Sequence, residues 1–359
     1  MRTLPDNRAS KFSSAERTVG KAMIVLTDCL GEKTDEGCLK VANSLVRRIK
    51  EAAPGTKVVT YGQRRSNSDC HLKLNKLFLN RRLFQLLNRE ERVLYIPFSS
   101  NTKASVLRTW ILSKLCRNKL SVLFVLRHQM DDLSKKLLQN SGARIIILSE
   151  ASFSFFWENL KNDVLYLKTG VDTEKFRPVA PEKKVALRQK YGIAEQETVV
   201  LHVGHLKAGR NVGKLLDIPD TYRVILVAST LTKDECDGGL WQQLAEKPNI
   251  TVMDTYLEHI EEIYQLADVY FFPVEQQGNC IDVPLSALEA AACNLPVVAT
   301  PYGELKQLLG KDGFYEIKSF EMLNELIQKA KEENYPTREH ILEYDWRFAV
   351  KQLLGGDGK

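Results

Sequence analysis

Short apolar segments rich in β-branched residues recur along the chain, separated by stretches whose apolar positions follow a helical period. They fall at residues 22–27, 57–61, 93–98, 121–126, 143–148, 198–204, 222–229, 249–254, 268–273 and 296–301. Continuous apolar strands that alternate with helices are typical of a parallel sheet covered on both faces. The pattern therefore predicts an α/β protein, with its functional residues in the loops that directly follow the strands.

The alternation runs twice, with a break near residues 169–184, where one glycine and two prolines disfavour regular structure. A chain of 359 residues has room for about two domains of ordinary size. We therefore expect two Rossmann-like, doubly wound domains that face each other across a cleft. The first spans residues 19–180, after a polar leader over residues 1–18, and the second begins at residue 181.

Charge changes this picture, because the net +6 is a small difference between two unlike halves. Residues 1–170 hold 30 Lys and Arg against 15 Asp and Glu, whereas residues 171–359 hold 21 against 30. A basic half attracts anionic surfaces or polymers. Within it, residues 71–90 set leucines and phenylalanines among lysines and arginines, which is typical of docking on an anionic membrane. A helix packed on the core with a solvated basic face is the alternative.

Composition excludes several other classes of protein. The chain is 44% hydrophobic and 27% charged, as in globular proteins, and it lacks both a membrane-spanning run and the apolar centre of a signal peptide, so we expect a cytoplasmic location. Its seven cysteines are scattered and never spaced as C-x-x-C, which predicts reduced thiols. The basic residues are not interleaved with aromatic platforms, so no nucleic-acid partner is expected.

The first candidate site follows residues 198–204. Gly204 ends the expected strand, and a short loop with His205, Lys207 and Arg210 precedes an expected helix. A glycine there lets a ligand approach the backbone, and cations beside a helix start suit a diphosphate. The spacing is neither G-x-G-x-x-G nor a Walker loop, which disfavours nicotinamide cofactors and P-loop use of ATP. A tight turn with solvated charges is the alternative.

Further candidates follow other strands. Glu289 stands among small apolar residues of an expected helix, where it either accepts hydrogen bonds from sugar or ribose hydroxyls or is an ordinary exposed residue. Gly303 lies in a loop that faces the same cleft, and Gly31 and Gly37 precede an amphipathic helix. His128, at a strand end, either polarises a reacting hydroxyl or is a packed, satisfied histidine.

No metal site and no other cofactor are expected. His202 and His205 are three residues apart on a strand, so they point to opposite faces, and no third ligand is evident. Asp131 and Asp132 stand at an expected helix start, where acids are favoured by the helix dipole.

Residues 143–309 resemble the retaining GT-B glycosyltransferases of family 4, within the glycosyl transferases group 1. VLYLKTGVDTEKFRPV resembles the family's connection between domains, and VLHVGHLKAGRNV resembles its first donor-domain strand with the G-R-x-x-x-x-K-G loop. IEEIYQLADVYFFPV and PLSALEAAACNLPVVATPYGELKQLL resemble the helix and strand before the donor site and the E-A-x-A-x-G-x-P-V-V-A-T signature. The resemblance implies that residues 181–340 bind a nucleotide-sugar, that the N-terminal domain binds the acceptor, and that residues 341–359 form a closing helix and tail.

The resemblance also implies roles for single residues. Glu289 matches the second acid of the Glu-x7-Glu motif, which holds the donor ribose, and Arg210 matches a basic residue that contacts the diphosphate. Gly37 matches the second glycine of the family's N-terminal Gly-Gly loop, with Glu36 in place of the first, and His128 is near the family's strand-end histidine. Gly31 and Gly37 are thus expected to belong to a loop for the acceptor or a phosphate. We expect the catalytic residues to be His128, Arg210 and Glu289.

The sequence departs from the family pattern at the donor site. His205 stands where the family has a further phosphate-binding arginine, unless Lys207 substitutes for it. Ile281 replaces the first acid of Glu-x7-Glu, with Asp282 one residue away, and Gln307 replaces a glutamate after the loop glycine. These departures indicate either a divergent specificity or lost activity.

The expected function is that of a retaining, metal-independent hexosyltransferase. It would move a sugar from a nucleoside-diphosphate donor, held by Arg210, Lys207, Glu289 and backbone amides near Gly303, to a glycan or lipid-linked acceptor of the cell envelope. The basic N-terminal domain would bring it to the inner face of an anionic membrane. A catalytically inactive, glycosyltransferase-like binding or scaffold protein is the alternative.

Overall fold

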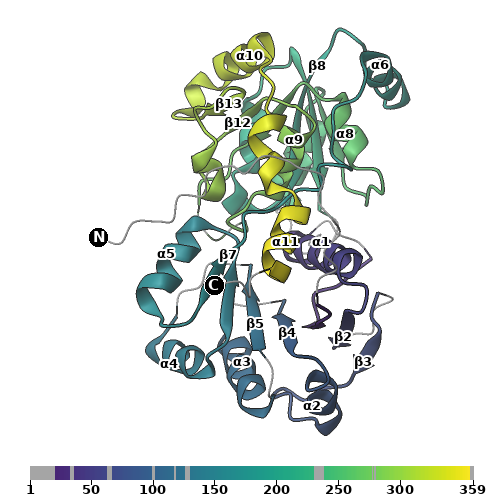
Figure 1. Ribbon diagram of the computed structural model, residues 1–359. Coiled ribbons are helices and arrows are strands. Elements are labelled where there is room, and N and C mark those ends of the chain that lie inside the picture. The colour runs from purple at the N-terminus through teal and green to yellow at the C-terminus, as the bar shows by residue number, and fades with distance from the viewer. Residues whose placement is uncertain are drawn as a thin grey trace.

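Two parallel sheets, each flanked by helices, make up the computed structural model of the chain (Figure 1). The structure describes residues 21–32, 36–62, 67–98, 102–116, 119–125, 130–229, 238–276, 278 and 280–355. Two doubly wound layers of this kind confirm the predicted α/β fold class.

The N-terminal sheet has seven strands in the order β3-β2-β1-β4-β5-β6-β7, and all neighbours are parallel. The strands are β1 (Ile24–Thr27), β2 (Lys57–Tyr61), β3 (Cys70–Leu72), β4 (Arg92–Ile96), β5 (Lys119–Phe124), β6 (Arg144–Ile147) and β7 (Val164–Tyr166). The helices are α1 (Gly37–Ala52), α2 (Arg81–Leu87), α3 (Lys103–Leu115), α4 (Asp132–Ser141) and α5 (Glu150–Asn159). The strand order reverses at β1, and ligands of such sheets bind at this point, beyond the carboxyl ends of the strands.

The C-terminal sheet repeats this plan with six parallel strands in the order β10-β9-β8-β11-β12-β13. They are β8 (Thr198–Gly204), β9 (Tyr222–Ala228), β10 (Ile250–Met253), β11 (Val269–Phe272), β12 (Val297–Ala299) and β13 (Phe314–Glu316). The helices are α6 (Pro181–Lys190), α7 (Gly238–Glu246), α8 (Glu261–Leu266), α9 (Leu285–Ala292) and α10 (Leu323–Glu333), with short 3-10 helices η1 (Ala208–Arg210), η2 (Val212–Asp217), η4 (Gly303–Gln307), η5 (Phe320–Met322) and η6 (Arg338–Tyr344). The strand order reverses at β8, whose last residue is Gly204.

All ten predicted strands are confirmed, because each is a continuous apolar run that both faces of its sheet bury. Every residue of β1, β4 and β11 is buried, for example. The strands β3, β7 and β13 were not among the predicted ones: each has only three residues and lies at the edge of its sheet. The equally short β12 was predicted, because it lies inside its sheet and is fully buried.

The chain crosses between the two sheets twice, after β7 and again before helix α11 (Trp346–Gly355), which packs against α1 (Figure 1). The two crossings bind each other: the fully buried Asp345 carboxylate accepts hydrogen bonds from the backbone N and Oγ1 of Thr173. Burial opposes ionisation, but the bonds from Arg347 and Thr173 outweigh it and hold the pKa of Asp345 below its usual range. Arg92 completes the attachment of α11 by donating to the carbonyl oxygens of Leu353 and Leu354.

The basic segment 71–90 does not form one amphipathic helix. It holds the end of β3, a turn and the seven-residue α2. Phe78, at φ 61°, inserts its ring between Tyr61 and Tyr95, while Leu83 and Leu87 are fully buried. Most of the apolar side chains thus belong to the core, as the alternative interpretation expects, whereas the exposed side chains include five basic residues together with Leu77 and Leu79. Among the described helices, none is long and apolar enough to cross a membrane.

Six of the seven cysteines lie in the described part of the chain. All six are free thiols, and four of them are buried, as the spacing predicted. Cys236 lies outside the described residues.

Candidate active site

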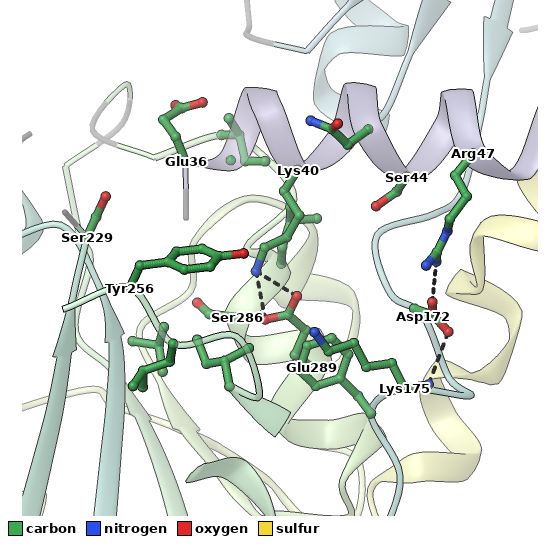
Figure 2. A pocket seen from close by; sticks show the side chains of 18 of the residues that line it. Glu36, Lys40, Ser44, Arg47, Asp172, Lys175, Ser229, Tyr256, Ser286 and Glu289 are labelled. Atoms are coloured by element: carbon green, nitrogen blue, oxygen red, sulfur yellow. Dashed lines mark hydrogen bonds and ion pairs between the residues drawn. The ribbon is translucent and has the colours of Figure 1, made fainter. Parts of the chain in front are cut away.

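A cleft of about 850 Å³ lies between the two domains at the carboxyl ends of both sheets. One wall is the face of α1 that carries Lys40, Ser44 and Arg47, and the opposite wall comes from the loops after β8, β9, β10 and β11. Figure 2 shows these α1 side chains pointing across the cleft toward Ser286, Glu289 and Asp172. Because both domains contribute, the cleft exists only when they come together.

The loop after β8 forms one end of this cleft. Gly204 ends the strand, and the 3-10 turn η1 brings Arg210 back beside it, closed by a bond from the Arg210 backbone N to the Lys207 oxygen at 2.9 Å. A Cβ on Gly204 would lie 3.5 Å from Arg210 Nη1 and 3.1 Å from His202 Nε2. Glycine at this position therefore lets the guanidinium lie against the strand end, where it lines the cleft.

The two histidines of β8 and its loop have different surroundings. His202 is buried, and desolvation lowers its pKa to about 4, so the ring is neutral. Its Nδ1 lies 2.9 Å from the Phe271 carbonyl oxygen and donates to it, since a carbonyl can only accept. His205 is 6% exposed and lines the cleft.

Metal-ligand chemistry is not assembled in the described residues: no group of three or more His, Cys, Asp or Glu side chains comes together there. Asp131 is instead the N-cap of α4, accepting from the Ser134 backbone N at 2.8 Å, and it pairs with Lys103 at 2.6 Å. The predicted helix start is thereby confirmed.

Glu289 lies on the cleft-facing side of α9. This helix consists otherwise of small and apolar residues, and Glu289 is only 2% exposed, so it is not an ordinary surface residue. Its carboxylate accepts hydrogen bonds from Lys40 Nζ at 2.8 and 3.0 Å (Figure 2). It also accepts one from the Tyr264 hydroxyl at 3.0 Å. Burial and the adjacent carboxylate raise the pKa of Tyr264, which therefore remains a donor.

The N-terminus of α1 meets the C-terminal domain directly. Glu36 is the N-cap and accepts from the Leu39 backbone N at 3.1 Å. A Cβ on Gly37 would lie 3.2 Å from Ile281 Cδ1, so the glycine permits close packing between the domains. Both Gly37 and Ile281 line the cleft, where Ile281 presents an apolar surface.

Sequence reasoning missed the polar face of α1. Lys40, Ser44 and Arg47 recur at helical spacing and all line the cleft, and Arg47 and Arg48 both pair with Asp172 after β7. The available signal was a polar stripe on a helix that follows the first strand. Such a stripe usually faces water, so only the second domain identifies it as a cleft wall.

Five of the predicted site residues line the cleft together: Gly37, Gly204, His205, Arg210 and Glu289. Four others, Gly31, Lys207, Asp282 and Gly303, are not among its lining residues. His128 lies outside the described residues.

The carboxylate of Asp282 is turned toward the N-terminal domain. Its Oδ2 accepts from Ser149 Oγ at 2.9 Å and Ser152 Oγ at 3.2 Å, at the start of α5. Its backbone oxygen accepts from the Glu304 N at 2.9 Å, with Gly303 directly beside it. Gln307 donates to Glu150 at 2.6 Å across the same junction. These residues connect the domains next to the cleft.

Comparison with known proteins supports one family. Residues 199–331 match the model of the family described as Glycosyl transferases group 1. D-inositol 3-phosphate glycosyltransferase of Corynebacterium urealyticum is 26% identical over 259 residues, which are 64% of this chain and 58% of that protein. The putative glycosyltransferase EpsD of Bacillus subtilis is 27% identical over 153 residues, 40% of this chain and 39% of that one. The matches thus span less than two thirds of either relative.

Solved structures extend the likeness to the whole fold. HepE of Anabaena, determined in complex with UDP and glucose, superimposes with a TM-score of 0.73 at 16% identity, covering 94% of this chain and 99% of that one. Sucrose-phosphate synthase of Thermosynechococcus elongatus gives a TM-score of 0.70 at 17% identity, covering 93% and 97%. The chain therefore has the GT-B fold, and its residues 199–331 carry the sequence pattern of the glycosyl transferases group 1.

Proposed function

We propose that this protein is a glycosyltransferase that takes its sugar from a nucleoside-diphosphate donor bound in the cleft between the domains. One observation carries the proposal. The same cleft is lined by Arg210, which lies beside Gly204 at the end of β8, and by the buried acid Glu289 on α9. The family match over residues 199–331 supports the same conclusion.

The donor would lie mainly on the C-terminal domain. Arg210, with His205 beside it, would hold the diphosphate at the end of β8, and the Glu289 carboxylate would accept hydrogen bonds from the ribose hydroxyls. A charged donor of hydrogen bonds that is already in place stabilises the charge that develops on the leaving diphosphate. We therefore propose that transfer needs no metal ion, and that it retains the anomeric configuration, as the resemblance implies.

A nucleotide panel tests this proposal. Thermal unfolding should be measured with UDP, GDP, ADP and TDP and with their sugar conjugates, since a ligand that binds only the folded state stabilises it. We expect one nucleotide to raise the unfolding midpoint by several degrees when present at about 100 times its Kd. Incubation of that donor with envelope glycans or lipid-linked sugars should then release nucleoside diphosphate, and NMR of the product should show the donor's anomeric configuration.

Three results would count against the proposal in different ways. No stabilisation by any nucleotide would reject the donor site. Binding without hydrolysis or transfer would favour the alternative function, a catalytically inactive binding protein. An inverted product would reject retention and leave the rest in place.

The acceptor is proposed to approach from the N-terminal domain at an anionic membrane surface in the cytoplasm. Lys73, Lys76, Arg81, Arg82 and Arg89 are all exposed, and Leu77 and Leu79 beside them are 43% and 52% exposed. Each cation near an anionic leaflet contributes about 1 kcal/mol of attraction. We expect the protein to float with vesicles that contain anionic lipid and to be released by salt. Equal binding to neutral vesicles would reject this electrostatic account.

A further inference from the structure

The ion pair between Lys40 and Glu289 joins the two walls of the cleft. Lys40 lies in the first turns of α1 in the N-terminal domain, and its ammonium donates to both oxygens of Glu289 at 2.8 and 3.0 Å. The lysine side chain is 21% exposed and the glutamate side chain 2%. A carboxylate this buried needs a compensating charge, and Lys40 supplies it from the opposite domain (Figure 2).

The same carboxylate is the group to which the proposed function assigns the donor ribose. A vicinal diol and an ammonium are both hydrogen-bond donors, and Tyr264 already takes part of the acceptor capacity of Glu289. Ribose binding would therefore displace Lys40. The hydroxyls satisfy the hydrogen bonds of the Glu289 carboxylate but bring no charge, so the displaced ammonium must stay near Glu289 and needs a new anion of its own within reach.

The donor itself brings that anion as its diphosphate. Besides Arg210 and Lys40, three lysines and arginines of the described residues line the cleft, and each pairs with a carboxylate that has no part in the proposed donor site: Arg47 with Asp172, Lys50 with Asp69 and Lys175 with Glu261. Lys40 differs because its partner is the residue that the donor would occupy.

We propose that Lys40 is a positioning residue of the donor site, which holds Glu289 before the donor binds and pairs with the diphosphate once the ribose has taken Glu289. This inference rests on the proposed function. It makes donor binding an exchange of partners between the domains: the contact from α1 moves from a protein carboxylate to the substrate.

The experiment compares two ligands on matched variants. The first ligand is the nucleoside diphosphate that binds the wild-type protein, identified among UDP, GDP, ADP and TDP, and the second is its parent nucleoside. Calorimetry and displacement titration will measure the affinity of the protein for each ligand. The nucleoside displaces Lys40 from Glu289 but offers the ammonium no anion. The diphosphate displaces Lys40 and also offers it an anion. We expect Lys40→Met to bind the nucleoside several times more tightly than the wild-type protein does. The factor by which the diphosphate binds more tightly than the nucleoside should fall by about tenfold, the size of one charge-assisted contact.

Three further variants make the result interpretable. Lys40→Arg should keep the wild-type ratio, since it retains a cation. Lys40→Gln should narrow the ratio as methionine does while still donating a hydrogen bond to Glu289, which guards against misfolding around an unpaired carboxylate. Lys114→Met, on α3 and bonded to the Asn140 carbonyl oxygen, removes the same charge away from the cleft and should change neither affinity.

The remaining outcomes separate the two claims. If no diphosphate binds the wild-type protein, the proposed function fails, and this inference fails with it. If a diphosphate binds but Lys40→Met and Lys40→Gln keep the wild-type ratio, the proposed function stands and Lys40 is only a structural contact.

Discussion

Replacement of Gly303 by alanine will lower the free energy of unfolding by about 3 kcal/mol or more. Gly303 has φ 50°, where a Cβ is strained, and that Cβ would lie 2.0 Å from the Asp282 carbonyl oxygen. To admit a methyl group, η4 and the segment of Asp282 must move apart. Chemical denaturation followed by circular dichroism will measure the loss.

The cost is high because both sides of this contact hold the domains together. Asp282 accepts from the two serines of α5, and the buried Glu304 accepts from the Glu150 backbone N at 2.8 Å and the Tyr166 hydroxyl at 2.5 Å. A shift that relieves the clash must lengthen the hydrogen bonds of either Asp282 or Glu304 to the N-terminal domain. We therefore expect Gly303→Ala to weaken the association of the domains as well as the fold of the second one.

Gly310→Ala is the matched control. Its φ is 86°, also in the left-handed region, but nothing lies within 4 Å of the added Cβ. The free energy of unfolding of this variant should fall only by the cost of the left-handed backbone conformation, about 1–2 kcal/mol. An equal loss in both variants would mean that the Asp282 carbonyl moves aside at no cost.

The second large effect is expected for Arg210→Met. Loss of a charge-assisted contact to the diphosphate should weaken the binding of the nucleoside diphosphate about 10- to 100-fold and slow donor hydrolysis or transfer by about 100-fold or more. The nucleoside, which has no phosphate, should bind as it does to the wild-type protein. Calorimetry with both ligands and a rate assay with the sugar donor check the two parts.

Arg223→Met is the control for Arg210→Met. Arg223 lies near the start of β9, at the end of the strand opposite the cleft, and it is not a lining residue. The substitution Arg223→Met removes the same charge from the same domain as Arg210→Met and should leave the binding of the nucleoside diphosphate unchanged. If both variants lose similar affinity for the nucleoside diphosphate, the donor is attracted by the net charge of the domain and not by a direct contact with Arg210 at the end of β8.

How far the sequence predicts this protein depends on the range of the interactions involved. The ten predicted strands are visible because burial on two faces demands an unbroken apolar run, which any reader of the sequence can find. The three-residue strands β3, β7 and β13 occupy sheet edges, where pairing with a neighbour decides the structure.

Residues 71–90 show a second limit of local sequence pattern. Their alternation of basic and apolar residues has the appearance of one amphipathic helix, yet Phe78 turns into the core at a left-handed backbone angle and divides the segment. Local pattern could not reveal this, because the aromatic cage that holds the ring comes from β2 and β4.

The site divides in the same way. By itself the sequence determined the fold class and the loops and helices on which five of the cleft-lining residues stand, because a residue that directly follows a parallel strand must lie at the ligand-binding edge of its sheet. Only the tertiary structure decided which of the candidates face each other. Lys40 and Glu289 are separated by 249 residues and belong to different domains, and no local pattern encodes their contact. It arises because a buried carboxylate needs a counter-charge, and the docking of α1 brings one within reach.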